Sequence, residues 1–196
     1  MKIQGKTYEE IANAGGGILN SANKLNHTSF DALYESAYKR LNRLIKLGTG
    51  AIEIKSGYGL NKESEIKMLR VIQKLKENLP IPIKATLLAA HAFPEAYKNN
   101  KDEYVDIVIN DILPEVANEK LADYIDVFCE HGFFSVSQTE RILNAGIKYG
   151  LKGKIHANQL NISGGVQVGV ACNALSVDHL EAIDDATIKT LQNKET

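Results

Sequence analysis

The sequence lacks several features that mark particular classes of protein. It contains two cysteines, Cys129 and Cys172, which lie far apart in apolar surroundings and form neither a disulfide framework nor a Cys-x-x-Cys metal motif. We therefore predict two buried free thiols and a reducing compartment. No apolar run approaches the roughly 20 residues that a membrane span requires, and no signal-peptide pattern opens the chain. A cytoplasmic protein that does not enter a membrane is expected.

An excess of charge of one sign is also lacking. The formal net charge is -1, so no basic surface argues for binding to nucleic acid or to an anionic membrane. Hydrophobic residues make up 44% and charged residues 24% of the 196 residues, as in an ordinary globular domain. We interpret Lys62, Glu63, Glu65 and Lys67 as part of a solvated helix face. No linker divides the chain, so residues 1–196 are expected to form a single domain.

Helical and extended patterns alternate along the chain. Strands are expected at residues 51–55, 83–90, 124–129, 154–156 and 174–177. Helices are expected after Ser29 as far as Gly48, at 62–78, around 105–116, from a capping box of Ser137 and Glu140 to Tyr149, around 165–171, and from Asp184 or Asp185. This alternation predicts an α/β fold with a parallel sheet and right-handed crossovers, either a barrel or a doubly wound sheet.

Polar residues recur at the carboxyl ends of the expected strands, namely Tyr58, His91, Glu130, His156 and His179. In a parallel barrel these ends form one rim, which is where barrel enzymes carry their active sites. In an open doubly wound sheet they would instead line a crevice at the sheet edge. A single histidine at a strand end is commonly a hydrogen-bonded structural residue. Three of the five histidines at successive strand ends favour a functional site.

Three of the loop residues at these strand ends also have structural interpretations. Tyr58 lies between Gly57 and Gly59, and it either caps a tight turn or contacts a ligand that the glycines allow to approach closely. Glu130 either anchors a neighbouring loop or histidine, or takes a direct part in the site. His131 is expected to be a solvated loop residue.

Five strings stand in the chain in an order that is characteristic of one enzyme family. They are Lys55-Ser-Gly-Tyr-Gly-Leu60, Ala90-His-Ala-Phe-Pro94, Phe128-Cys-Glu130, Lys154-Ile-His-Ala-Asn-Gln159 and Asp178-His-Leu-Glu181. Together with residues 4–11 and 14–17, they resemble the imidazolonepropionases of the amidohydrolase superfamily. The resemblance covers essentially the whole chain, and the string that ends at Leu60 is the most specific.

The resemblance implies a (β/α)8 TIM-type barrel, a small flanking β-sandwich and a possible homodimer. It also implies one divalent metal, zinc or iron, held by an early His-x-His pair, a later histidine that His156 matches, and a late aspartate. His179 matches a histidine that lies beside the metal-bound water and transfers a proton. Tyr58 and His91 match positions that contact the substrate ring and its carbonyl. Gln159 stands where many members carry a glutamate that bonds the ring.

The chain departs from the family pattern in two respects. It contains no His-x-His pair, and the late aspartate and the upstream arginine that binds the substrate carboxylate are also absent. The 196 residues are therefore expected to be the central portion of the barrel, without the N- and C-terminal parts, and to bind metal weakly, turn over poorly and fold with difficulty when alone. Gln159 differs from the usual glutamate because an amide cannot ionise or act as a charged base.

The implied reaction opens the ring of 4-imidazolone-5-propanoate to give N-formimidoyl-L-glutamate in histidine degradation. One alternative is an amidohydrolase that acts on another cyclic amide. A second is a non-catalytic α/β binding domain whose rim histidines are structural. A nucleotide-binding doubly wound domain is disfavoured, because residues 15–17 lack the spacing of a dinucleotide fingerprint and no such fingerprint follows a strand.

Overall fold

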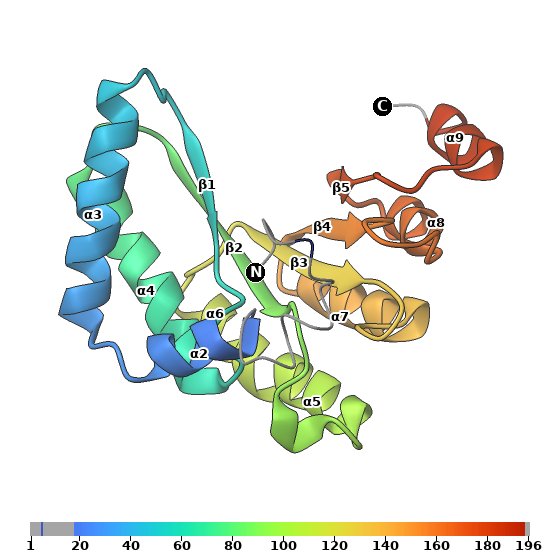
Figure 1. The fold of residues 1–196 in the computed structure, drawn as a ribbon, viewed down its shortest axis with the longest axis horizontal. Helices are drawn as coiled ribbons and strands as arrows, with labels where there is room; N and C mark the ends of the chain where they lie inside the picture. The colour runs from blue at the N-terminus through green and yellow to red at the C-terminus, as the bar shows by residue number, and fades with distance from the viewer. Residues whose placement is uncertain (1–4, 6–17, 195–196) are drawn as a thin grey trace.

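Each strand of the sheet lies beside the strand that precedes it in the chain (Figure 1). The computed structural model describes residue 5 and residues 18–194. Its sheet consists of five parallel strands in the order β1 (Ile52–Lys55), β2 (Ile83–Ala90), β3 (Tyr124–Cys129), β4 (Lys152–Ala157) and β5 (Ser176–His179). A doubly wound sheet reverses its strand order at a switch point. The consecutive order of this curled sheet instead confirms the predicted part of a (β/α)8 barrel.

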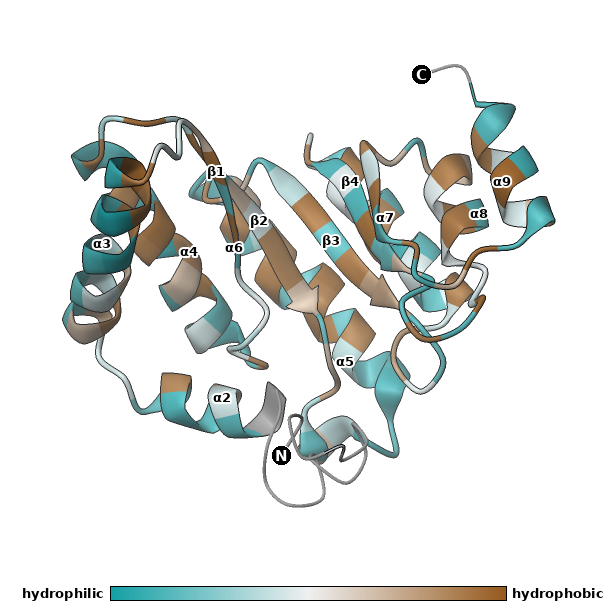
Figure 2. Ribbon diagram, turned by 45° about the horizontal axis from the view of Figure 1, so that its top comes forward, coloured by the Kyte–Doolittle hydropathy of each residue, from teal (hydrophilic) through white to brown (hydrophobic). Residues whose placement is uncertain are grey.

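Helices connect the strands and cover one face of the sheet, as α4, α6 and α7 show in Figure 2. The α-helices are α2 (Ile18–Asn26), α3 (Phe30–Lys46), α4 (Lys62–Asn78), α5 (Lys101–Ile107), α6 (Leu113–Asn118), α7 (Val136–Lys148), α8 (Gly165–Ala171) and α9 (Asp185–Gln192). The short 3-10 helix η2 (Glu95–Tyr97) precedes α5, and the π-helical turn η3 (Val108–Ile112) joins α5 to α6. None of the helices in residues 18–194 is long and apolar enough to cross a membrane.

Alternation along the strands separates an apolar face from a polar one. Ala85, Leu87, Ile125 and Val127 are fully buried against the helices. The packing there is close, because a Cβ added to Gly146 of α7 would lie 2.5 Å from the Cγ2 of Ile125. Close contact between a helix residue and a strand side chain of this kind fixes the distance between the helix and the strand.

The concave face is lined by charged and polar side chains, which include Glu53, Lys55, Thr86, Asp126 and Lys154. Branched apolar residues fill this position in most barrels. Thr86 and Asp126 are buried nevertheless, with 0% and 1% of their surface exposed. Buried polar groups require hydrogen-bond partners, and the partners here come from other strands.

The observed elements differ from the predicted ones at several places. Strand β4 spans Lys152–Ala157 rather than residues 154–156, and the helix predicted around residues 105–116 is divided into α5, η3 and α6. The capping box at the start of α7 is formed by Ser135 and Gln138, not by Ser137 and Glu140, so the helix starts earlier than predicted. Strand β5 spans Ser176–His179 rather than the predicted residues 174–177. The sequence patterns did not predict α2, and Glu65 is fully buried rather than solvated.

Other predictions are confirmed. Asp184 caps α9, Ser29 caps α3, and Cys129 and Cys172 are buried free thiols. Residues 4–11 and 14–17, which contributed to the family resemblance, lie outside the described part of the chain. Within residues 18–194, no strand pairs with the outer edge of β1 or with the outer edge of β5.

Candidate functional site

Four aromatic rings form a row across the carboxyl ends of the strands. The rings of Tyr58 and His91 meet edge to face with their centroids 5.3 Å apart. The ring of His156 lies 6.0 Å from that of His91 and 5.1 Å from that of His179. Segments that follow or end β1, β2, β4 and β5 thus bring together the tyrosine and three histidines that the sequence placed at the rim. His27 lies away from them, in the turn between α2 and α3, and its Nδ1 is bonded to the backbone oxygen of Asn23.

The backbone of β5 turns sharply to bring His179 into this row. In the strand register His156 pairs with Asp178, so simple alternation would turn His179 toward the opposite face. His179 and Leu180 instead have φ angles of +84° and +63°. A left-handed conformation costs a non-glycine residue on the order of 1–3 kcal/mol, which the surroundings must offset. Its Nδ1 lies 3.1 Å from the Oε1 of Glu181, which helps to orient the ring.

Tyr58 is carried by a loop that is held from below by a buried carboxylate. The two oxygens of Glu65, in the first turn of α4, accept hydrogen bonds from the backbone N–H groups of Gly57, Gly59 and Leu60 at 2.9, 2.7 and 3.0 Å. Burial raises the pKa of Glu65, while these donors act in the opposite direction. The loop geometry beneath Tyr58 therefore depends on a residue that the sequence patterns had assigned to solvent.

His91 is joined to the same loop. Its Nδ1 lies 3.1 Å from the carbonyl oxygen of Gly57, and because that oxygen can only accept, Nδ1 carries the hydrogen. Burial lowers the pKa of His91 below its ordinary value, so the neutral ring is favoured. Its Nε2 is then a hydrogen-bond acceptor, and His91 can donate through Nε2 only after it is protonated.

The rings of Tyr58, His91, His156 and His179 are called the histidine row below. A network of charged side chains lies beneath this row on the concave face of the sheet. The Lys55 ammonium lies 2.6 Å from the Oδ2 of Asp126 and 3.0 Å from the Oδ2 of Asp178. Nδ1 of His156 lies 3.0 Å from the Asp126 carboxylate. On the adjoining side, Glu53 accepts hydrogen bonds from the Thr86 hydroxyl at 2.6 Å and from Lys154 at 2.7 Å.

Asp126, His156 and Asp178 each offer a ligand atom, and these atoms lie within 4.8 Å of one another, as in a cation site. However, the Lys55 ammonium already bridges the two carboxylates. A metal ion placed among the same oxygens would therefore be repelled by a fixed positive charge. With Lys55 in this position, these three groups do not form an open cation site.

Glu130 anchors the loop that follows β4. It accepts bonds from the backbone N–H groups of Leu160 and Asn161 at 2.9 and 3.1 Å, and from the N–H of His131 at 2.8 Å. Burial opposes ionisation of this group, but these donors prevail and lower its pKa. Gln159 lies in the anchored loop and is partly exposed. Of the two interpretations of Glu130, the contacts favour loop anchoring.

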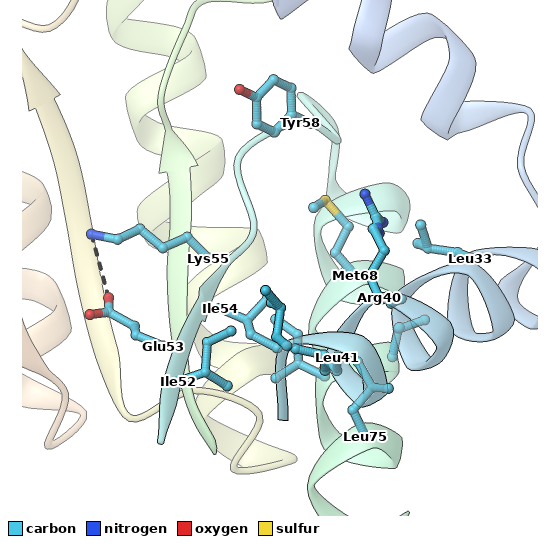
Figure 3. Close-up of a pocket in the computed structure, with 14 residues that line it drawn as sticks. Leu33, Arg40, Leu41, Ile52, Glu53, Ile54, Lys55, Tyr58, Met68 and Leu75 are labelled. Atoms are coloured by element: carbon cyan, nitrogen blue, oxygen red, sulfur yellow. Dashed lines mark ion pairs between the residues drawn. The ribbon is translucent and has the colours of Figure 1, made fainter. Parts of the chain in front are cut away.

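A groove of about 460 Å³ lies along β1 between α3 and α4; Tyr58 and Lys55 are among its lining residues, but none of the three histidines of the row is. Figure 3 shows Ile52 and Ile54 turned toward these helices, while Glu53 and Lys55 turn toward the other strands. The groove is lined mainly by apolar side chains such as Leu41 and Leu75. It lies beside the outer edge of β1, so we regard it as a boundary of the sheet rather than as the reaction site.

Comparison with known proteins adds an independent finding. No protein-family model matches the chain. Over 195 residues it is 62% identical to the imidazolonepropionase of Flavobacterium johnsoniae and 58% identical to that of Christiangramia forsetii, with all of the chain and 47% of each relative covered. The imidazolonepropionase of Shewanella oneidensis is 47% identical over 196 residues, with 48% of its length covered. The chain is related to the imidazolonepropionases.

This relationship confirms the resemblance that the motif strings indicated, and it extends over the whole chain. The chain spans about half the length of the curated relatives it matches. A five-stranded part of a barrel with two unpaired edges, among the residues described, agrees with that proportion. Sequence reasoning identified the residues of the histidine row but missed Glu65, Asp126, Asp178 and the lysine that joins the two aspartates.

Proposed function

We propose that these 196 residues form the central portion of an imidazolonepropionase, within a single barrel domain completed by other segments of a longer parent protein. The parent would open the ring of 4-imidazolone-5-propanoate by hydrolysis and yield N-formimidoyl-L-glutamate. The observation that carries the proposal is the row of Tyr58, His91, His156 and His179 at one rim, in a chain related to imidazolonepropionases along its whole length.

The residues at the two ends of the row would divide the work of binding and proton transfer. Tyr58 is 38% exposed and presents its ring and hydroxyl to the rim, where they would contact the planar substrate ring. His179 would accept a proton from the attacking water and return it to the leaving ring nitrogen.

His91 would bind the substrate carbonyl in its protonated state. A neutral His91 presents an acceptor at Nε2, because Nδ1 is engaged by Gly57. Donation to a carbonyl oxygen that gains charge would therefore require the protonated ring. Gln159 would lie near the ring through the loop that Glu130 anchors, and its amide would bond the substrate without acting as a base.

His156 fits the requirements of one metal ligand. Its Nδ1 faces the Asp126 carboxylate, which leaves Nε2 as the coordinating atom, and imidazole is a suitable ligand for both zinc and iron. A catalytic zinc usually takes three protein ligands, so the remaining ligands would come from segments of the parent outside these 196 residues. Such a metal, when bound, would polarise the carbonyl and lower the pKa of water to about 7.

The test uses the purified parent and its His179→Gln and His156→Gln variants, assayed with 4-imidazolone-5-propanoate. Loss of one proton-transfer group should lower kcat about 100- to 10,000-fold. His27→Gln is the matched control, because His27 lies outside the row, and it should retain normal turnover. A parent that does not open the ring, or a His179→Gln variant as fast as the control, would refute the proposal. An inactive parent that hydrolyses another cyclic amide would support the alternative amidohydrolase.

A further inference from the structure

Asp126 is the residue at which the charged network and the histidine row meet. Its side chain is completely buried, on β3 between β2 and β4. Oδ2 receives the 2.6 Å bond from Lys55, and both Oδ1 and Oδ2 lie 3.0 Å from Nδ1 of His156. A buried carboxylate with two different partners of this kind has little freedom to rotate.

The bond from Lys55 determines what Asp126 offers to His156. An ionised carboxylate only accepts hydrogen bonds, and an ammonium group only donates them. Lys55 is itself held between Asp126 and Asp178, with Glu53 3.4 Å away, so its ammonium lies among acceptors from three strands. Nδ1 of His156 must therefore carry the hydrogen, and in the neutral ring Nε2 is left with its lone pair.

We propose that Asp126, held by Lys55, is a positioning residue that fixes His156 in the Nδ1–H tautomer and so presents Nε2 for coordination. Only the effect on metal binding and catalysis rests on the proposed function, because the tautomer of His156 can be observed without turnover. Removal of the carboxylate that orients a ligating histidine typically weakens metal binding about 10- to 100-fold.

The geometry makes the Asp126→Asn variant informative, because the amide has two unlike ends. Lys55 can bond only the amide oxygen, which would direct the NH2 group toward Nδ1 of His156. The NH2 group would lie 3.0 Å from Nδ1 and favour the form with its hydrogen on Nε2, while the amide oxygen, also 3.0 Å from Nδ1, would still accept from Nδ1–H. The variant should thus raise the population of the Nε2–H tautomer. In Lys55→Met/Asp126→Asn the amide is free to turn and can offer its oxygen to Nδ1 in either orientation, so the population of the Nδ1–H form should rise again.

The experiment is long-range 1H–15N NMR of the metal-free, 15N-histidine-labelled parent, combined with Zn²⁺ affinity by chelator competition. We expect Nδ1–H at His156 in the unmodified protein, a larger share of Nε2–H in Asp126→Asn with Zn²⁺ bound about 10- to 100-fold more weakly, and a partial return of both in the double variant. Glu53→Gln is the control, because Glu53 belongs to the same polar layer but does not contact His156, and it should keep the Nδ1–H form.

An Nε2–H signal from His156 in the unmodified parent would overturn the inference without the use of any variant, even if a substitution prevented folding. Equal Zn²⁺ affinity in the parent and in a folded Asp126→Asn protein would overturn it as well. Failure of the parent to open 4-imidazolone-5-propanoate, with the tautomers as expected, would refute the proposed function and leave the role of Asp126 intact.

Discussion

Replacement of Glu65 by glutamine should destabilise the protein far more than its position on a charged helix suggests. The two oxygens of Glu65 accept three backbone hydrogen bonds from the loop that carries Tyr58. A glutamine oxygen placed at Oε1 could keep the bonds from Gly59 and Leu60, but its NH2 group would then face the N–H of Gly57. The glutamine NH2 group and the Gly57 N–H, both donors, would then face each other at about the 2.9 Å that separates the Glu65 oxygen from the Gly57 nitrogen, in a site that is fully buried.

The size of the effect follows from that geometry. A buried donor left without a partner costs about 1–3 kcal/mol, and the loss of charge from the two remaining bonds weakens them by about 1 kcal/mol each. The glutamine no longer carries the cost of a buried charge, which offsets part of the loss. We therefore expect a decrease of about 2–4 kcal/mol in the free energy of unfolding.

The measurement is urea unfolding of the parent protein, followed by circular dichroism, for Glu65→Gln and for Glu63→Gln as the matched control. Glu63 belongs to the same first turn of α4 but is exposed, and a surface change of this kind usually stays within about 0.5 kcal/mol. A Glu65→Gln protein with the stability of the control would refute the argument that Glu65 holds the loop. In an active parent the same substitution should raise KM, because the loop positions both Tyr58 and His91.

Three further predictions concern other parts of the described chain. Gly59→Ala should destabilise by more than about 2 kcal/mol in urea unfolding, because the new Cβ would lie 2.5 Å from a backbone nitrogen, whereas Gly50→Ala has open space and should be neutral. Burial opposes ionisation of Asp123, but two lysines and a backbone N–H lower its pKa to about 2. Ionised Asp123 contributes at most about 2 kcal/mol to the free energy of unfolding, and solvent screening reduces this value. The contribution is present above the unfolded pKa and is lost as the pH falls toward 2. Asp123→Asn should therefore flatten the acid unfolding curve in that pH range. Tyr104→Phe should cost about 1 kcal/mol in thermal unfolding, because it removes the 3.0 Å bond to the Ala89 carbonyl.

The strands and helices could be predicted where local pattern and local chemistry agree. The helix at residues 62–78 and the strand at 83–90 were predicted with the bounds observed, because prolines separate an amphipathic run from a continuous apolar one. The start of α7 was misplaced because Ser135 with Gln138 and Ser137 with Glu140 both fit the capping-box pattern. The two starting points differ by two residues, and only the path of the preceding chain distinguishes them.

The supporting residues of the site were harder to predict, because their partners are distant in the sequence. Glu65 shares a helix face with Leu69 and Ile72, at steps of four and three, and this spacing is a signal that it points inward. That signal shows burial but does not reveal the loop that Glu65 bonds. Similarly, Asp126 stands within a strand of buried residues, which marks it as unusual, yet its lysine partner lies 71 positions earlier.

The charged network also explains why this sheet must curl. Strands β1 and β5 are four steps apart in the sheet, which in a flat arrangement would separate them by about 19 Å at roughly 4.8 Å per step. A lysine and an aspartate cannot bridge such a gap, yet the Lys55 ammonium lies 3.0 Å from Asp178 on the far strand. The contact can therefore form only on the concave side of a strongly curved sheet. The same ammonium fixes Asp126 beneath His156, so both the curvature of the sheet and the orientation of the His156 imidazole involve one partly buried lysine.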